Sequence, residues 1–191
     1  MGITTSSSRA YTPLTYEDYL EFPDDGRRYE IIEGDLHVSP APNRGHQRVL
    51  WTLANLIGNY AERLGLGEMY FAPIDLNPDP ENVVQPDLIF ISKERLGIFA
   101  EDGSRLTAAP DLAVEVLSPS SRKRDLKAKK TLYERIGVAE YWVVDYEMEE
   151  VHVFTRSPTG AFSPPRVLTG DAILSTPLLP SLEIPLPKLW P

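Results

Sequence analysis

The segment PDLAVEVLSPSS, residues 110–121, constrains the fold of this chain more than any other stretch. Its first part is apolar on both sides of a predicted strand, which is typical of a strand covered on both faces of a sheet. With a period of two residues, one face carries Leu112, Val114 and Val116, and the other carries Ala113, Glu115 and Leu117. An ionised carboxylate buried alone costs several kcal/mol, so Glu115 must meet a cation, a metal ion or a proton.

The rest of the chain alternates helical and extended patterns, which predicts mixed α and β structure. Apolar residues at helical spacing predict an amphipathic helix over residues 44–64 that packs on a sheet. A short helix is expected over YEDYL behind Thr15, a hairpin around Gly34 and a further helix over about residues 121–136. Extended segments are predicted within residues 67–78, paired with each other, and at residues 86–92, 140–145, 150–156 and 161–168.

The length of 191 residues fits one domain, and a hydrophobic content of 42% is enough to fold it. We expect a flexible N-terminus over residues 1–14 and a single domain over residues 15–191. The stretch around residues 97–109 is expected to be mobile. The proline- and leucine-rich C-terminal segment is expected to wrap along the surface in extended form or to meet a partner chain.

Two compositional features exclude classes of protein. No apolar run reaches the roughly 18 residues of a membrane span. The chain contains no cysteine, so disulfides and thiolate metal sites are excluded, and a reducing cytoplasm is compatible.

The net charge of -9 argues against a protein that coats nucleic acid through its overall field. Basic residues are nevertheless concentrated in RKRDLKAKK, residues 122–130, which carries six basic side chains and one acidic one. Such a run is usually a solvated helix face. Because the protein as a whole is acidic, a nucleic acid would have to bind at a local group of basic residues such as this one.

Helical geometry separates the residues of this basic run. At about 100° per residue, Leu132, Tyr133 and Ile136 define a buried arc. Lys129 falls on that arc with Asp125, whereas other basic positions face away, among them Lys123, Arg124, Lys127 and Lys130. Arg122 also projects inward, but it lies in the first turn, where a long side chain reaches water. Lys129 is therefore predicted to be a buried lysine in the same region as Glu115.

The start of this helix breaks a local rule. Helix N-termini favour acidic residues, yet the expected cap, Ser120 or Ser121, is followed by Arg122, Lys123 and Arg124. Solvation can tolerate this arrangement. Alternatively, free amides and basic side chains form an anion site suited to a phosphate backbone.

A second acidic residue, Asp87, opens the apolar strand predicted at residues 86–92. If the two strands are adjacent, Asp87 and Glu115 would offer hard oxygen ligands to Mg²⁺ or Mn²⁺. The simpler alternative is that a lysine or arginine packs against Glu115 as a structural ion pair.

These residues carry a resemblance to a known family. The segments VVQPDLIFIS and PDLAVEVLSPSSRKRDLKAKKTLYERIGVAEYWVVD, preceded by RYEIIEGDL and HQRVL, resemble the Uma-type family of putative restriction endonucleases. That family belongs to the PD-(D/E)xK nuclease superfamily. The likeness runs from Thr15 to about Leu182, and its central segment is far more specific than an isolated Pro-Asp pair.

The resemblance implies a fold and a site. The fold is an α/β (α+β) arrangement with a mixed central β-sheet flanked by helices, the restriction-endonuclease-like core. Asp87 and Glu115 correspond to the metal ligands of the two motifs, and the carbonyl of Val116 is a possible further ligand. Where the superfamily pattern has lysine, two residues after Glu115, this chain has Leu117. In this family the lysine has moved to the following helix, where it corresponds to Lys129, the residue that helical geometry also selected.

Two more positions match polar residues of the family's site, Glu30 and His46. Glu30 has a structural alternative, since it could pair with Arg28 or another strand residue. His46 lies one turn before Val49 on the inward side of its helix, so a satisfied core histidine is an equal alternative to a catalytic one.

We therefore expect an Mg²⁺- or Mn²⁺-dependent endonuclease that hydrolyses phosphodiester bonds of nucleic acid, with DNA as the expected substrate. Arg122, Lys123, Arg124 and Lys127 would position the strand through phosphate contacts. A cytoplasmic homodimer that does not contact membranes is expected. The alternative is a catalytically inactive nuclease-fold protein, an interaction module in which Glu115 and Lys129 form an ion pair and the C-terminal segment contacts a partner.

Overall fold

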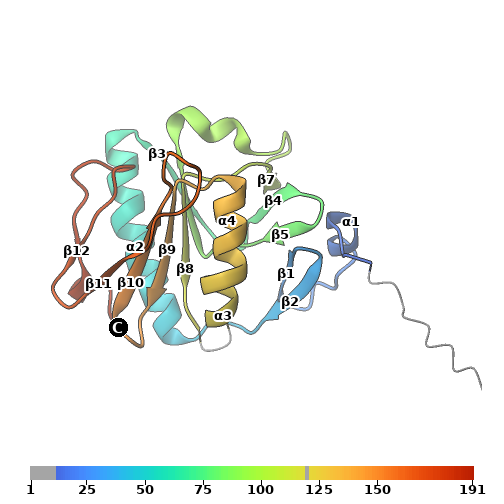
Figure 1. The fold of residues 1–191 in the computed structure, drawn as a ribbon, viewed down its shortest axis with the longest axis horizontal. Helices are drawn as coiled ribbons and strands as arrows, with labels where there is room; N and C mark the ends of the chain where they lie inside the picture. Colours follow the sequence, from blue (N-terminus) through green and yellow to red (C-terminus); the bar gives the residue numbers. More distant parts are fainter. Residues whose placement is uncertain (1–11, 119–120) are drawn as a thin grey trace, which may run out of the picture.

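The computed structural model describes residues 12–118 and 121–191. Its centre is a six-stranded mixed sheet in the order β11-β10-β9-β8-β6-β3 (Figure 1). All neighbouring strands are antiparallel except β8 and β9, which run parallel. The strands are β3 (Gly67–Phe71), β6 (Leu88–Ser92), β8 (Leu112–Val116), β9 (Glu140–Asp145), β10 (Glu150–Thr155) and β11 (Arg166–Thr169).

A smaller sheet has the order β2-β1-β5-β4-β7. Its hairpin of β1 and β2 turns through Glu33 and Gly34, which both have positive φ, as a two-residue hairpin turn requires. This sheet brings β1 next to the helical connection between β8 and β9 (Figure 1). Its strands are β1 (Arg28–Ile32), β2 (Asp35–Ser39), β4 (Asp75–Asp79), β5 (Asn82–Val84) and β7 (Arg105–Leu106).

Helix α2 (Arg44–Leu64) covers one face of the six-stranded sheet. The side chain of Asn43 accepts a hydrogen bond from the His46 N–H at its start, and Gly65 ends it in the left-handed conformation. Val49, Leu53 and Ile57 pack there against alternate strand residues such as Val114 and Trp142. The predicted amphipathic helix over residues 44–64 is thus confirmed, and so is the short helix after Thr15, α1 (Tyr16–Tyr19).

The connection from β8 to β9 covers the opposite face. Leu132 and Tyr133 pack there with Ala113 and Leu117, the predicted second face of β8. The predicted helix over about residues 121–136 is confirmed, and it contains a π-helical turn, η2 (Asp125–Lys129), between α3 (Arg122–Arg124) and α4 (Lys130–Ile136). Residues 119–120 are not described, so Ser120 as a cap lies outside the described residues.

Two predictions need correction. Strands β3 and β4 do not pair with each other, because β3 joins β6 and β4 joins β5 and β7. The C-terminal segment does not only follow the surface, because its apolar side chains are buried in the α2-side core, namely Leu174, Leu179, Leu182, Ile184, Leu186 and Leu189. The stretch of residues 97–109 contains the end of a 3₁₀ helix, η1 (Lys93–Ile98), and strand β7, and its mobility stays a prediction.

This segment contains the short pair β12 (Ile173–Leu174) and β13 (Ile184–Pro185), followed by the 3₁₀ turn η3 (Leu186–Lys188). Within residues 12–118 and 121–191, no helix has the length and apolar character that crossing a membrane requires.

Candidate active site

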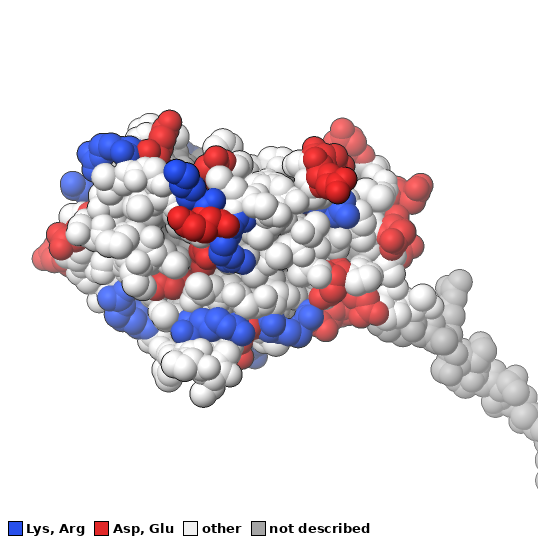
Figure 2. Space-filling view, turned by 90° about the horizontal axis from the view of Figure 1, so that it is seen from above, with Lys and Arg blue, Asp and Glu red and all other residues white. Residues whose placement is uncertain are grey.

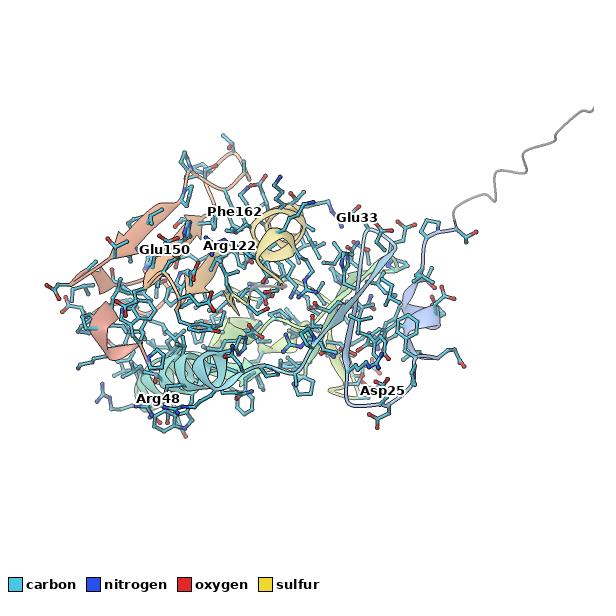
Figure 3. The ribbon with its side chains drawn as sticks, turned by 90° about the horizontal axis from the view of Figure 1, so that it is seen from below. Asp25, Glu33, Arg48, Arg122, Glu150 and Phe162 are labelled. Carbon is cyan, nitrogen blue, oxygen red and sulfur yellow. The ribbon has the colours of Figure 1, made fainter. Side chains whose placement is uncertain are left out.

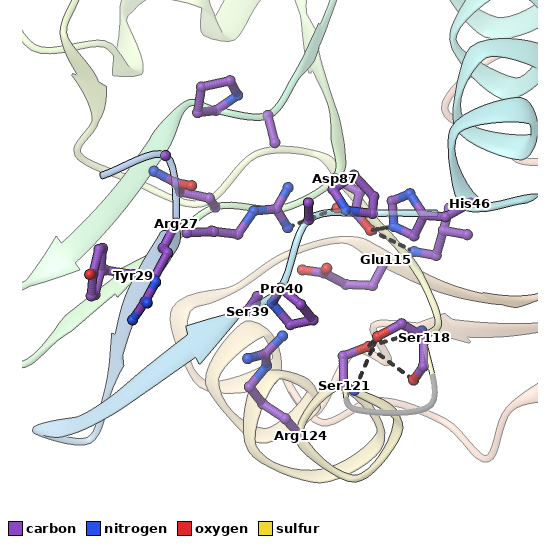
Figure 4. Close-up of a pocket in the computed structure, with 18 of the residues that line it drawn as sticks. Arg27, Tyr29, Ser39, Pro40, His46, Asp87, Glu115, Ser118, Ser121 and Arg124 are labelled. Carbon is purple, nitrogen blue, oxygen red and sulfur yellow. Dashed lines mark hydrogen bonds and ion pairs between the residues drawn. The ribbon is translucent and has the colours of Figure 1, made fainter. Parts of the chain in front are cut away.

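A cavity of about 800 Å³ opens between the ends of β6 and β8, the start of α2, the start of α3 and the small sheet. Asp87, His46 and Glu115 lie together in this cavity, and Tyr29 and Arg27 lie on its far side (Figure 4). Because Leu88 pairs with Val114 in antiparallel register, Asp87 stands opposite Glu115 where the two strands end. The structure therefore brings together the two acidic residues that the sequence selected.

Asp87 is held by three donors. The Arg28 guanidinium lies 2.9 Å from Oδ1, while Oδ2 is 3.0 Å from His46 Nε2 and accepts the Val116 N–H at 2.9 Å. Burial alone would raise the pKa of this carboxyl, but the hydrogen bond with His46 and the charge of Arg28 hold its pKa well below the usual range. Asp87 is therefore ionised at neutral pH.

Glu115 has a different environment. Lys129 Nζ and the Tyr133 hydroxyl both donate to its Oε1, at 2.8 and 2.7 Å. Burial raises the pKa of Glu115 to about 8, because the lysine charge only partly offsets desolvation and the nearby Asp87 charge. Among the described residues no group donates to Oε2, so this oxygen is available to a ligand in the cavity.

Lys129 is fully buried, as helical geometry predicts, and lies 2.8 Å from both Glu115 Oε1 and Glu30 Oε1. Glu30 also accepts the Gln85 N–H at 2.9 Å, and its Oε2 lies 3.6 Å from Arg124. Glu30 therefore pairs with Lys129 and Arg124, and the alternative of a pair with Arg28 is wrong. Neither Lys129 nor Glu30 lines the cavity, so the ammonium lies behind Glu115.

This buried cluster has more acids than cations. Four carboxyls, those of Glu30, Asp87, Glu115 and Asp125, face three permanent cations, those of Arg28, Arg124 and Lys129. Burial alone would lower the pKa of Lys129, but Glu115 and Glu30 raise it, so the lysine is charged. The raised pKa of Glu115 favours a proton on this carboxyl at neutral pH, and a bound cation could replace it.

The π-helical turn places two of these groups. Asp125 and Lys129 are its first and last residues, and both are buried. The Tyr141 hydroxyl donates to the Asp125 carbonyl at 3.0 Å, which satisfies one backbone acceptor in the turn. Such turns inside helices occur frequently at functional sites.

The residues predicted to contact nucleic acid do not share one surface; they are Arg122, Lys123, Arg124 and Lys127. Only Arg124 lines the cavity, with its side chain directed into it (Figure 4). Arg122 pairs with Asp145 and lies 4.0 Å from Glu150, on the side of the large sheet. Lys123 and Lys127 are exposed. On the face in Figure 2, basic and acidic side chains are interspersed, so no field of one sign covers it.

His46 is buried, with 7% of its surface exposed, and only one of its two ring nitrogens has a hydrogen-bond partner among the described residues. Its Nε2 contacts Asp87, while Nδ1 is buried without a hydrogen-bond partner. A core histidine with both nitrogens satisfied is therefore not what the structure contains. His46 lines the cavity beside Asp87.

Two members of the site are not among the residues that the sequence patterns predict. Arg28 is expected only as an alternative partner of Glu30, but it contacts Asp87. Gln85, which precedes Asp87 by two residues, donates its backbone N–H to Glu30. The spacing of two between Arg28 and Glu30 on one strand was a usable signal, because it places both side chains on the same face.

The donor set fits a hard divalent cation with few protein ligands. No group of three or more His, Asp or Glu side chains in residues 12–118 and 121–191 could hold a metal by itself. Mg²⁺, however, is commonly held by one or two carboxylates, with water and substrate phosphate as the other ligands. Oε2 of Glu115 accepts no hydrogen bond from the described residues and Oδ1 of Asp87 accepts only one, so each acid keeps a lone pair for a cation, and the Val116 carbonyl remains a predicted further ligand.

Residues 16–187 match the Uma2 family, described as putative restriction endonucleases, and this chain belongs to that family. The resemblance stated from the sequence is thus confirmed.

The fold is also shared with a solved structure. A crystal structure of a putative nuclease belonging to DUF820, from Anabaena variabilis, superposes with a TM-score of 0.79 at 19% identity. The match covers 93% of this chain and 98% of the other, and at this identity it establishes the fold alone. No curated protein matches this chain.

Proposed function

We propose that this protein is an Mg²⁺- or Mn²⁺-dependent endonuclease that hydrolyses phosphodiester bonds, with DNA as its substrate. The observation that carries the proposal is the pairing of Asp87 and Glu115 at neighbouring strand ends in one cavity, with Lys129 2.8 Å behind Glu115. Family membership and the nuclease-like fold support the same class of reaction.

Asp87 and Glu115 would hold the metal, which when bound lowers the pKa of a coordinated water and neutralises charge on the phosphate. Asp87 is prepared for this role, since Arg28 and His46 keep it ionised. Glu115 must first lose its proton, and the nearby ammonium of Lys129 stabilises the resulting carboxylate.

Lys129 acts through Glu115 in this arrangement. The ammonium is sealed from the cavity, so it holds and orients the Glu115 carboxylate and does not contact the substrate in this conformation. Glu30 orients Lys129 from the other side, and both are therefore positioning residues. Arg27, Arg28 and Arg124 line the cavity and can contact a phosphate.

One observation favours the alternative of an inactive interaction module. Lys129 already bridges Glu30 and Glu115, which satisfies the cluster as a buried ion pair without a metal. That alternative also expects the apolar C-terminal segment to contact a partner, but the leucines of this segment are buried within this chain. The enzyme remains our proposal. A cytoplasmic homodimer remains a prediction from the sequence.

The test has two parts. Thermal shift with Mn²⁺ is expected to stabilise the wild-type protein and not Asp87→Asn or Glu115→Gln. Cleavage of plasmid, single-stranded DNA and RNA is then assayed with Mg²⁺ or Mn²⁺. Loss of either carboxylate should reduce cleavage by more than about a hundredfold, since metal catalysis supplies several kcal/mol. Two outcomes would contradict the proposal. One is that Mn²⁺ stabilises wild type and both variants equally, and the other is that Glu115→Gln cleaves as the wild type does.

A further inference from the structure

The outer surface of α2 next to the cavity carries an exposed tryptophan beside two arginines. Trp51 is 59% exposed, although tryptophan is usually well covered in a folded domain. The Arg48 guanidinium lies 5.4 Å from the centre of its ring. Arg44, Gln47, Arg48 and Trp51 line a shallow second hollow together with Pro191. We call these four α2 residues the α2 strip.

The α2 strip is basic in an acidic protein. The helix has three arginines and a single acidic residue, Glu62, near its far end, whereas the chain has a net charge of -9. Most cavity and α3 arginines are paired with carboxylates, as with Arg28, Arg122 and Arg124. Among the described residues, Arg44 and Arg48 form no ion pair, so their charges are available to an external anion.

The α2 strip continues directly from the candidate active site. Gln47 lines both the cavity and the second hollow, one turn before Trp51 on the same helix. Figure 3 shows Arg48 on the outer side of α2, away from Arg122 on the helical connection across the sheet. A chain with its phosphate beside Asp87 and Glu115 can therefore leave the cavity over Gln47 and meet Arg44, Arg48 and Trp51.

We propose that the α2 strip binds an unpaired stretch of the nucleic-acid substrate next to the cleaved bond, with Trp51 stacked on a base and the two arginines on phosphates. This inference deepens the proposed function and rests on it. Aromatic rings bind single strands because every base has a face to stack on, while in a duplex that face is covered by the neighbouring base. A single exposed tryptophan flanked by arginines therefore fits an unpaired strand.

Binding is measured in EDTA by anisotropy of a labelled single-stranded DNA of about fifteen nucleotides. Trp51→Ala is expected to weaken binding at least about fivefold, the effect of one stacked base. Trp51→Phe should restore part of the loss. Arg63→Ala is the matched control, because Arg63 lies over the Tyr60 ring at the opposite end of the same helix. Its affinity should match that of the wild type.

An abasic oligonucleotide separates stacking from charge. It should bind wild type and Trp51→Ala equally, whereas Arg44→Ala and Arg48→Ala should weaken its binding and reduce the salt dependence. Tryptophan emission gives a second readout, because Trp142 is fully buried and Trp190 is partly buried against the core, whereas Trp51 is exposed. Single-stranded DNA should quench the wild type, and most of the quench should be lost in Trp51→Ala.

The inference is overturned if the wild type does not bind single-stranded DNA, if Trp51→Ala binds it as the wild type does, or if the abasic strand depends equally on Trp51. Its failure differs from failure of the proposed function. Metal-dependent cleavage with no effect of Trp51 removes the α2 strip alone. Trp51-dependent binding without cleavage removes the nuclease alone and leaves a single-strand binding surface.

Discussion

Asp87 and Glu115 lie opposite each other on neighbouring strands, and each is only 2% exposed, yet their pKa values move in opposite directions. Burial penalises both carboxylates. Asp87 overcomes the penalty because Arg28, His46 and a backbone N–H all serve its two oxygens. Glu115 has the Tyr133 hydroxyl and one lysine, which it shares with Glu30. The donors around each carboxylate, and whether its cation is shared, therefore separate the two acids.

The difference would suit the reversible metal binding that we propose. An ionised Asp87 would provide a permanent anionic ligand, whereas a proton on Glu115 limits the negative charge that the cluster must hold without a metal. A bound cation would replace that proton. Four predictions test this difference between the two acids.

The largest expected effect comes from the shared cation. Lys129→Met should cost about 3–5 kcal/mol in the free energy of unfolding, because it leaves the buried Glu30 and Glu115 without their common partner. Urea denaturation at pH 7 measures this. Lys127→Met, at an exposed position on the same helical connection, is the control. A loss below about 1 kcal/mol for Lys129→Met would show that the lysine charge is not needed by both acids.

The second prediction compares the two acids directly. Asp87→Asn should destabilise by about 2–3 kcal/mol at pH 7, because it removes the charge that Arg28 and His46 stabilise. Glu115→Gln should not destabilise at pH 7, since it replaces a protonated acid by a neutral amide and removes a group that the unfolded state holds ionised. Urea denaturation of both variants decides it. Equal losses would mean that Glu115 is ionised and that the comparison fails.

The third prediction concerns pH. A native pKa of about 8 for Glu115 lies above its unfolded value of 4.5, so the native state holds the extra proton between these values. This group stabilises the fold fully below pH 4.5 and loses that contribution as the pH rises to about 8, by up to about 1.4 kcal/mol per pH unit.

Asp87 has the opposite sign, because its pKa is lowered from 3.8 and its contribution is lost only in acid. The stability difference between Glu115→Gln and wild type should therefore grow from pH 5 to pH 8, in favour of the variant. Melting curves across this range test it. A difference that does not depend on pH contradicts the raised pKa of Glu115.

The smallest effect is expected outside the cluster. Lys123→Ala should change stability by less than about 0.5 kcal/mol, because its side chain is exposed. If it positions a nucleic-acid backbone, it should still weaken binding and lower the salt slope by about one unit. Titrating binding at several salt concentrations checks this, with Arg124→Ala, whose side chain lies in the cavity, as the comparison. Equal salt slopes for wild type and Lys123→Ala would remove Lys123 from the contact surface.

Much of the architecture could be predicted from local sequence. The apolar run around Glu115, the amphipathic residues 44–64 and the hairpin at Gly34 are short-range patterns, and the structure contains each of them. Lys129 was identified in the same way, because a helix repeats every 3.6 residues or so and a shift into a π-helical turn still leaves that residue inward.

Which charged residues pair depends on the three-dimensional fold. Arg28 contacts Asp87 across 59 residues of sequence. Lys129 contacts both Glu115, on the six-stranded sheet, and Glu30, on the smaller sheet. Periodicity places a side chain on a face but does not say which distant residue faces it, so the sequence could select both acids without telling them apart. Their opposite pKa values follow from those long-range partners, since burial alone acts on both acids in the same direction.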